Sequence, residues 1–190
     1  MPPFDIILAS ASPRRRELLS LMFEDFRVLT SNFDESEVPS DLLPAEHVIF
    51  SATEKARDVA KDHPNSLIIG ADTIVVVDEQ ILGKPKDEQD AARMLRLLSG
   101  RTHEVYTGIA AILNDIERRD VECTEVRFRD LSEEMISRYI ATGEPQDKAG
   151  AYAIQGKGAT LIKGISGCYP NVVGLPLYKL SVLLSEFWKG

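Results

Sequence analysis

Along the chain, short runs of apolar residues alternate with longer stretches in which apolar residues recur every three or four positions. The runs at 6–9 and 67–71 are apolar throughout, which is typical of strands buried on both faces. Between these runs, the spacing predicts a helix from Pro44 to about His63. Its apolar face is formed by Val48, Ala52, Ala56, Val59 and Ala60. This alternation of strand and helix indicates an α/β fold.

The remaining elements are predicted from the same kinds of apolar pattern, together with alternation of apolar and polar residues and with turn residues. We expect strands at 27–30, 73–77, 103–113 and 121–128, and short glycine-rich strands within 151–173. We expect helices at 13–22, 87–98, 132–141 and 175–188. The Asp78-Glu79 pair predicts a hairpin turn towards Ile81-Leu82. Because the strand order is mixed and helices are interleaved, we expect a mixed, bent β-sheet with flanking helices, arranged as two lobes.

Length and charge narrow the functional classes. The chain has 190 residues, enough for one domain or for two lobes that share a core. Its formal net charge is −8, which argues against broad binding to nucleic acid, because such binding needs a basic surface. The N-terminal stretch contains Asp5 and an apolar run too short for a signal peptide, and no run approaches the length of a membrane span. We therefore expect a soluble, cytoplasmic protein that binds neither nucleic acid nor membrane.

The stretch "LASASPRRRELL" (8–19) places three arginines at the point where a strand is followed by a helix. Ser12 is the expected N-cap of that helix. Arginines in the first turn oppose the helix dipole, at a cost of about 0.3–1 kcal/mol each. A solvated basic face is one interpretation of this pattern. In an acidic chain, unfavourably placed arginines beside Ser10 and Ser12 instead favour an anion site suited to phosphate groups.

Carboxylates and lysines supply a second set of candidates. In "GADT", Asp72 follows a buried apolar run, so we expect it at the carboxyl end of a strand, where open α/β sheets bind ligands. There it could bind a divalent metal or accept a proton from water, and capping a turn is the alternative role. The acidic run "FDESE", with Glu35, is either a solvated loop or the source of a metal ligand. Lys55 in "SATEKA" and Lys84 in "GKP" would each, taken alone, be surface lysines.

A third candidate is "DKAGAYAIQGKG" (147–158), in which Gly150, Gly156 and Gly158 surround Tyr152 and Gln155. Glycines at this density allow a ligand to approach the backbone closely. The stretch has neither the Walker pattern nor the dinucleotide-binding glycine pattern. It therefore predicts a ligand-binding loop of another kind.

Taken together and in order, "LASASPRRRELL", "SATEKA", "GADT", "GKP", "LSGRTHEVYTG" and "DKAGAYAIQGKG" closely resemble the Maf family of nucleoside triphosphate pyrophosphatases, from Leu8 to about Leu184. The resemblance implies a single Maf-like domain over 1–190, with two lobes around a central cleft, related in fold to the inosine triphosphate pyrophosphatases. It also implies hydrolysis of a nucleoside triphosphate to monophosphate and pyrophosphate with Mg²⁺ or Mn²⁺, and a homodimer. The associated cellular role would be sanitation of the nucleotide pool or growth control.

The resemblance also implies roles for individual residues. Glu35 and Asp72 would serve the metal and the attacking water, with Asp72 as the proton acceptor, and Lys55 and Lys84 would act with them in catalysis. The residues that would bind the substrate are Ser10, Arg14, Arg15, Lys55, Thr73, Lys84 and Gln155. Cations and a divalent metal suit this role, because a triphosphate carries about four negative charges. Arg16 matches no family position, so we expect a solvated helix residue there.

Arg14, Thr73 and Gln155 are the residues that the resemblance assigns to base choice. The pattern "SPRR" with "AYAIQG" is similar to the family branch that acts on dTTP and UTP, with modified uridine triphosphates among its candidate substrates. One glutamine amide can donate a hydrogen bond to the carbonyl of uracil or thymine and accept one from its N–H. The alternatives are the branch that acts on 7-methyl-GTP and a nucleotide-binding regulator of cell division without turnover.

Overall fold

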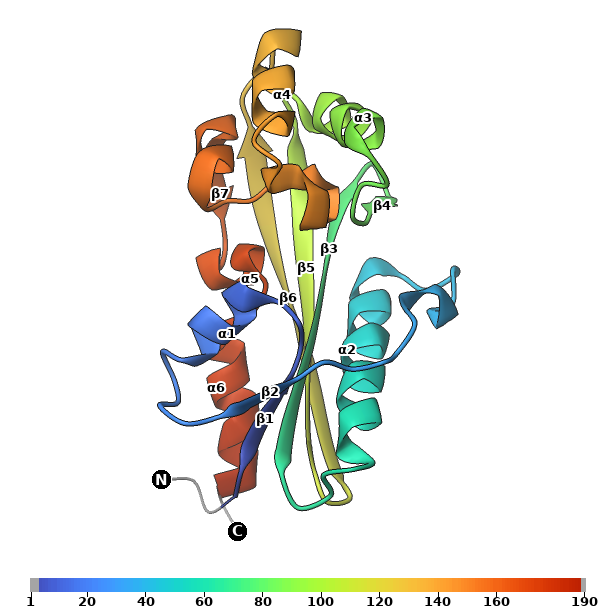
Figure 1. The fold of residues 1–190 in the computed structure, drawn as a ribbon, viewed down its shortest axis with the longest axis vertical. Helices are drawn as coiled ribbons and strands as arrows, with labels where there is room; N and C mark the ends of the chain where they lie inside the picture. Colours follow the sequence, from blue (N-terminus) through green and yellow to red (C-terminus); the bar gives the residue numbers. More distant parts are fainter. Residues whose placement is uncertain (1–3, 189–190) are drawn as a thin grey trace. The chain divides into compact units, whose positions relative to one another are not determined.

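The structure, a computed structural model, describes residues 4–188. Residues 1–3 and 189–190 of the predicted domain lie outside the described residues. The described chain forms a seven-stranded sheet in the order β2-β1-β3-β5-β6-β7, with β4 paired to β3 (Figure 1). The strands are β1 (Ile6–Ala9), β2 (Arg27–Leu29), β3 (Leu67–Val77), β4 (Gln80–Leu82), β5 (Thr102–Leu113), β6 (Ile116–Phe128) and β7 (Ile162–Ser166).

Six α-helices and several short 3-10 segments accompany the sheet in the described range. The α-helices are α1 (Pro13–Leu19), α2 (Pro44–Ala60), α3 (Glu88–Leu98), α4 (Glu133–Ile140), α5 (Tyr169–Val173) and α6 (Leu177–Ser185). Because β1 runs parallel to its neighbours whereas β4 and β7 pair antiparallel, the sheet is mixed. The predicted α/β class, with a mixed sheet and flanking helices, is confirmed.

The chain divides into two compact units. Unit 1 comprises Met1–Asp72, Thr107–Glu122 and Gly174–Gly190, and unit 2 comprises Thr73–Tyr106 and Cys123–Val173. The long strands β3, β5 and β6 therefore each contribute residues to both units.

Unit 1 is built on parallel strands. β1 pairs in parallel with β2 and with β3, and its ladder with β3 ends at the pair Ala9 and Gly70. Helix α2 packs its apolar face on these strands through Ala52 and Ala56, which join Ile7 and Ile68 in one buried cluster. Figure 1 shows α6 on the other side of the strands from α2. The helix periodicity read from the sequence is therefore that of a face buried against the sheet.

Unit 2 contains the predicted hairpin. β3 and β4 are antiparallel and joined by Asp78 and Glu79, whose φ angles of 48° and 64° are both positive, as a two-residue type I′ turn requires. Helices α3 and α4 pack on this part of the sheet, with Leu95 and Ile136 in the same buried cluster as Phe128. Apolar side chains at helical spacing on α3 and α4 account for that packing.

The structure corrects some element boundaries. The stretch 151–173 was expected to contain several short strands, but it holds the 3-10 segment Gly156–Leu161, the one strand β7 and helix α5. Helix α1 ends at Leu19 rather than Met22, because the amides of Leu21 and Met22 bond three residues back in a tighter turn. β6 begins at Ile116 rather than Val121. The first half of this strand is polar and largely exposed, so it lacks the apolar alternation from which a strand is predicted.

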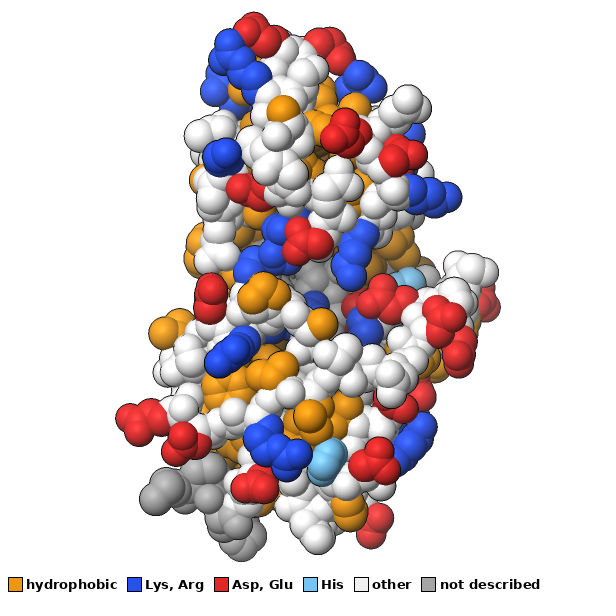
Figure 2. Space-filling model, in the orientation of Figure 1, with side chains coloured by type: hydrophobic (Ala, Val, Ile, Leu, Met, Phe, Trp, Pro, Cys, Tyr) orange, Lys and Arg blue, Asp and Glu red, His pale blue; other side chains and the backbone are white. Residues whose placement is uncertain are grey.

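The surface in view carries charges of both signs. Figure 2 shows lysine and arginine side chains interspersed with acidic ones over both units. Among the described residues, no helix is long and apolar enough to cross a membrane.

Candidate active site

Three charged side chains of unit 1 meet at one ammonium group. Lys55 Nζ donates to Asp72 Oδ1 at 2.6 Å and to Glu35 Oε1 at 2.7 Å. The side chains of Lys55 and Asp72 are only 12% and 11% exposed, whereas that of Glu35 is 57% exposed. The sequence-predicted lysine and both predicted carboxylates thus form one hydrogen-bonded group that is open to solvent on the Glu35 side.

Two glycines allow α2 to carry Lys55 close to the sheet. A Cβ at Gly70 would lie 2.2 Å from the Ala52 carbonyl oxygen, and one at Gly108 would lie 2.4 Å from the Val48 carbonyl group. Both positions would clash with the backbone of α2, so only glycine permits this approach. Gly70, the glycine of "GADT", and Gly108, the last residue of "LSGRTHEVYTG", therefore position the helix. The sequence patterns did not predict this role.

Asp72 lies inside β3, which corrects the expectation that it ends a strand. The β-branched residues from Thr73 to Val77 continue the strand and pair with β4. The parallel ladder with β1, however, ends at Gly70. Asp72 therefore still lies just beyond the carboxyl end of a parallel strand pair, and Ser10 directly follows the other strand of that pair.

Glu35 is held by a short 3-10 turn, Glu35–Glu37. Asp34 caps this turn by accepting a hydrogen bond from the Ser36 amide at 2.8 Å, and this bond lowers the pKa of Asp34 below its ordinary value. Asn32 precedes this turn in the chain, and its amide donates a hydrogen bond to the Asp58 carboxylate of α2 at 2.8 Å. Helix α2 thus presents Lys55 and also fastens the loop that brings Glu35 to it.

Ser10 and Arg15 form a second group in unit 1. Ser10 is buried, and its Oγ accepts hydrogen bonds from the Ser12 amide at 3.2 Å and from Arg15 Nη1 at 3.4 Å. Arg15 Nε donates to the Gly174 carbonyl oxygen at 2.8 Å. Burial lowers the pKa of Arg15 below its ordinary value, and the charges of Asp72 and Glu35 offset only part of this effect.

The other two arginines differ in exposure. Arg14 is partly buried, and Arg16 is exposed in the last turn of α1, as expected for a solvated helix residue. Ser12 caps α1 as predicted, accepting from the Arg15 amide at 3.4 Å. That contact occupies one of the amides at the helix start that have no partner within the helix.

The remaining predicted residues, Thr73, Lys84 and Gln155, lie in unit 2. Thr73 is partly buried in β3, Lys84 is exposed in the loop after β4, and Gln155 is partly buried at the start of the 3-10 segment Gly156–Leu161. The Gly150 amide donates to the Gly83 carbonyl oxygen at 3.0 Å. This bond joins the "GKP" loop to the "DKAGAYAIQGKG" loop within unit 2.

The donor set around Lys55 suits a hard divalent cation. The described residues contain no group of three or more His, Cys, Asp or Glu side chains arranged to hold a metal ion. Mg²⁺ in nucleotide-hydrolysing sites, however, is commonly held by one or two carboxylates together with substrate phosphates and water. Glu35 and Asp72, both within hydrogen-bond distance of one ammonium nitrogen, meet that smaller requirement.

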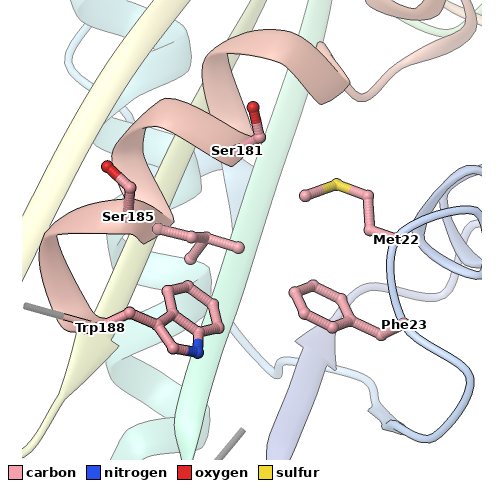
Figure 3. A pocket seen from close by; sticks show the side chains of 6 residues that line it. Met22, Phe23, Ser181, Ser185 and Trp188 are labelled. Carbon is pink, nitrogen blue, oxygen red and sulfur yellow. The ribbon is translucent and has the colours of Figure 1, made fainter. Parts of the chain in front are cut away.

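An apolar pocket of about 270 Å³ lies elsewhere in unit 1 (Figure 3). It is lined by Met22, Phe23, Ser181, Leu184, Ser185 and Trp188. The Phe23 and Trp188 rings stack across it with centroids 6.2 Å apart. None of the lining side chains is charged, so this pocket does not suit a triphosphate.

The chain is similar over nearly its whole length to a protein family and to several curated proteins. The profile of a family described as "Maf-like protein" matches residues 5–187. A "dTTP/UTP pyrophosphatase" from Clostridium botulinum (strain Okra / Type B1) is 50% identical over 189 residues, which cover 96% of each chain. A protein of the same name from Dictyoglomus thermophilum is 51% identical, with 96% of this chain and 95% of that protein covered.

One solved structure bears on the fold alone. The HAM1 protein from Coxiella burnetii shares 17% sequence identity with this chain and superimposes with a TM-score of 0.52, covering 96% of this chain and 99% of that one. The mixed α/β architecture is therefore shared with a protein of very different sequence.

Proposed function

The chain belongs to the Maf-like protein family, and we propose that it hydrolyses dTTP and UTP to the corresponding monophosphate and pyrophosphate. The observation that carries this proposal is the group formed by Lys55, Asp72 and Glu35, which lies in the same unit as the hydrogen-bonded pair of Ser10 and Arg15. The names of relatives about 50% identical to this chain support the same activity. Cations that stabilise charge on the phosphate oxygens and a carboxylate that accepts a proton from water both promote hydrolysis between the α- and β-phosphates.

Asp72 acts as the proton acceptor in this proposal. Its Oδ1 is engaged by Lys55, and among the described residues no side chain or amide donates to its other oxygen. That oxygen is available to orient a water molecule and to take its proton as the water attacks phosphorus. Lys55 holds the carboxylate in place and adds positive charge beside the reacting phosphate.

Arg14, Arg15, Lys84 and the Ser10 hydroxyl bind the triphosphate oxygens. A guanidinium group can bind two phosphate oxygens at once, whereas a lysine binds as a point charge. Arg15 is fixed by its bonds to Gly174 and Ser10, so its planar group is preorganised for an anion. Charge placed in advance stabilises the leaving pyrophosphate without further reorganisation.

Glu35 and Asp72 would hold Mg²⁺ or Mn²⁺. When bound, such a metal would withdraw charge from the phosphate oxygens and make water more acidic. The exposed Glu35 carboxylate is the ligand most accessible from solvent.

Arg14, Thr73 and Gln155 select the base in this proposal. The amide of Gln155 offers one donor and one acceptor, which matches the carbonyl and imide N–H of uracil or thymine. A carboxylate at this position would instead suit the two adjacent donors of guanine.

The test is to measure pyrophosphate release by purified protein from dTTP, UTP, CTP, GTP and 7-methyl-GTP. We expect the highest kcat/KM for dTTP and UTP, and one monophosphate formed per pyrophosphate. Asp72→Asn keeps the size of the side chain and should lower kcat by about 10²-fold or more while nucleotide binding persists. Turnover confined to 7-methyl-GTP would assign the chain to the alternative branch, and nucleotide binding without turnover would favour a regulator.

A further inference from the structure

The loop 152–158, which carries Gln155, is fastened on both sides by two side chains that have no role in the proposed reaction. Tyr139 lies in α4 and is 4% exposed. Glu144 follows the left-handed turn at Gly143. Both belong to unit 2, as does the whole loop.

Tyr139 holds the side of the loop that precedes Gln155. Its hydroxyl accepts a hydrogen bond from the Ala153 amide at 3.0 Å. The same hydroxyl donates to Glu144 Oε1 at 2.8 Å. A single buried oxygen thus links the loop to the second fastening residue.

Glu144 holds the side that follows Gln155. Its Oε2 accepts from the Lys157 amide at 3.0 Å and its Oε1 from the Gly158 amide at 2.9 Å. Partial burial raises the pKa of Glu144, but the bonds from Gly158, Lys157 and Tyr139 outweigh it and lower the pKa below its ordinary value. The carboxylate is therefore ionised at neutral pH and binds both amides as a charged acceptor.

The glycines of the loop allow these contacts. A Cβ at Gly156 would lie 2.6 Å from Glu144 Oε2, and one at Gly158 would lie 2.6 Å from the Tyr139 hydroxyl. Gly156 also has a φ of 66°. The two glycines of "GKG" thus let the backbone approach Glu144 and Tyr139 more closely than a residue with a Cβ would allow.

Gln155 lies between the two fastened points. Within the described part of the chain its own side chain makes no hydrogen bond, so the loop backbone sets the position from which this side chain extends. We infer that Tyr139 and Glu144 are positioning residues that aim Gln155 at the base and thereby set base selectivity. This inference rests on the proposed function, because it concerns the residue proposed to recognise uracil or thymine.

The test uses two substitutions that preserve size. Tyr139→Phe removes the hydroxyl that both Ala153 and Glu144 bind. Glu144→Gln turns one carboxylate oxygen into a donor, which must then face an N–H or O–H donor whichever way the amide is turned. Each variant should lower kcat/KM for dTTP and UTP by about 10–100-fold. The preference for dTTP over CTP should fall as well.

The decisive comparison repeats both substitutions in a Gln155→Ala background. If the two residues act through Gln155, they should change kcat/KM by less than about twofold there, because coupled residues are not additive. An equal loss in both backgrounds would show a merely structural role and overturn the inference. Tyr106→Phe is the matched control, because Tyr106 forms a second tyrosine–glutamate pair, with Glu104 at 3.1 Å, in the same unit. Glu133→Gln is the control for the carboxylate, since Glu133 pairs with Arg96 on the surface.

Amide hydrogen exchange of residues 152–161 gives a readout that needs no turnover. Exchange should rise at least tenfold in Tyr139→Phe and Glu144→Gln and stay unchanged in the two controls. If the wild-type protein releases no pyrophosphate from any nucleotide, the proposed function is wrong, and the inference about base selectivity fails with it. Unchanged exchange in an enzyme that prefers dTTP and UTP would overturn the inference alone.

Discussion

At the scale of single residues, the candidate site depends on one ammonium group between two carboxylates. Lys55 and Asp72 are nearly buried, whereas Glu35 is more than half exposed. Breaking a buried ion pair costs more than the pair contributes, because the remaining charge is left without a partner away from water. The ion pair therefore couples the stability of unit 1 to its proposed chemistry.

Lys55→Met should test that coupling. We expect the free energy of unfolding to fall by about 2–4 kcal/mol, because Asp72 loses its partner while largely buried, and kcat/KM for dTTP to fall by at least about 10²-fold. Urea unfolding and pyrophosphate release measure the two effects. Lys61→Met is the matched control: Lys61 follows α2, is 73% exposed and pairs with Asp58 at 3.4 Å, so its loss should cost less than about 0.5 kcal/mol. Equal destabilisation by both substitutions would contradict the argument.

A second residue-scale effect concerns pH. His103 of unit 2 is 2% exposed, and its Nε2 lies 2.7 Å from the Tyr152 hydroxyl. Burial lowers the pKa of His103 to about 4, whereas the unfolded chain has a value of about 6.5. Between these values the unfolded state binds more protons than the folded state, so stability falls as the pH drops through this window.

We predict that this histidine removes about 2–3 kcal/mol of stability between pH 7 and pH 4.5. Urea unfolding of the wild type and of His103→Gln at both pH values isolates the effect, because glutamine does not titrate. The variant should be less stable at pH 7, where it loses the native packing, but its stability should fall less steeply as the pH is lowered. Parallel pH dependences for the two proteins would assign the acid sensitivity to other groups.

At the scale of elements, features encoded by neighbouring residues could be predicted from the sequence, whereas those shaped by distant contacts could not. The predicted segment 6–9 is β1, and the expected Ser12 cap binds an amide at the start of α1. These features are encoded within a few residues of each other. The 3-10 segment after Gln155 is shaped by Glu144, which lies more than ten residues away, so no local pattern could reveal it.

The site shows the same division. Asp72 could be chosen from the sequence because it follows a buried apolar run, whereas Lys55 and Glu35 became candidates only through the resemblance of their motifs to those of the family. Their meeting at one nitrogen atom depends on the seating of α2 against Gly70 and Gly108. In the sequence, the only sign of this close packing is a glycine in each strand. A glycine in a strand has several interpretations, so the packing could not be predicted from it.

Gly70→Ala should therefore act on the site through helix α2. The added methyl group would lie 2.2 Å from the Ala52 carbonyl oxygen and 3.0 Å from Ala56 Cβ, so α2 must move away from β3. We expect a loss of stability of about 1–3 kcal/mol or more, and a loss of activity as Lys55 leaves Asp72. Gly164→Ala in β7 is the matched control, because its methyl group would meet only the end of Arg127 at 3.5 Å. Thermal unfolding and kcat/KM measure both effects, and a fully active Gly70→Ala protein would argue against tight seating.

At the scale of the whole molecule, an acidic protein must bind an anion. The chain has a formal net charge of −8, and the substrate adds about four negative charges. The residues proposed to bind the triphosphate, Arg14, Arg15, Lys55 and Lys84, would supply four positive charges, of which the carboxylates Glu35 and Asp72 would offset two. The proposed residues alone therefore leave the triphosphate only half neutralised, and a divalent cation would supply the difference.

We predict that turnover of dTTP requires a divalent cation and that Glu35 sets the concentration needed. Excess chelator should lower pyrophosphate release by at least about 10²-fold, and added Mg²⁺ or Mn²⁺ should restore it. Glu35→Gln keeps the shape of the side chain but weakens one proposed ligand, so half-maximal activity should require about tenfold more Mg²⁺. Glu37→Gln removes an equal charge from the same 3-10 turn and is the matched control, which should leave the Mg²⁺ dependence unchanged. If both substitutions shift the Mg²⁺ dependence equally, Glu35 acts through general electrostatics rather than as a ligand, and full turnover in chelator would remove the metal from the proposal.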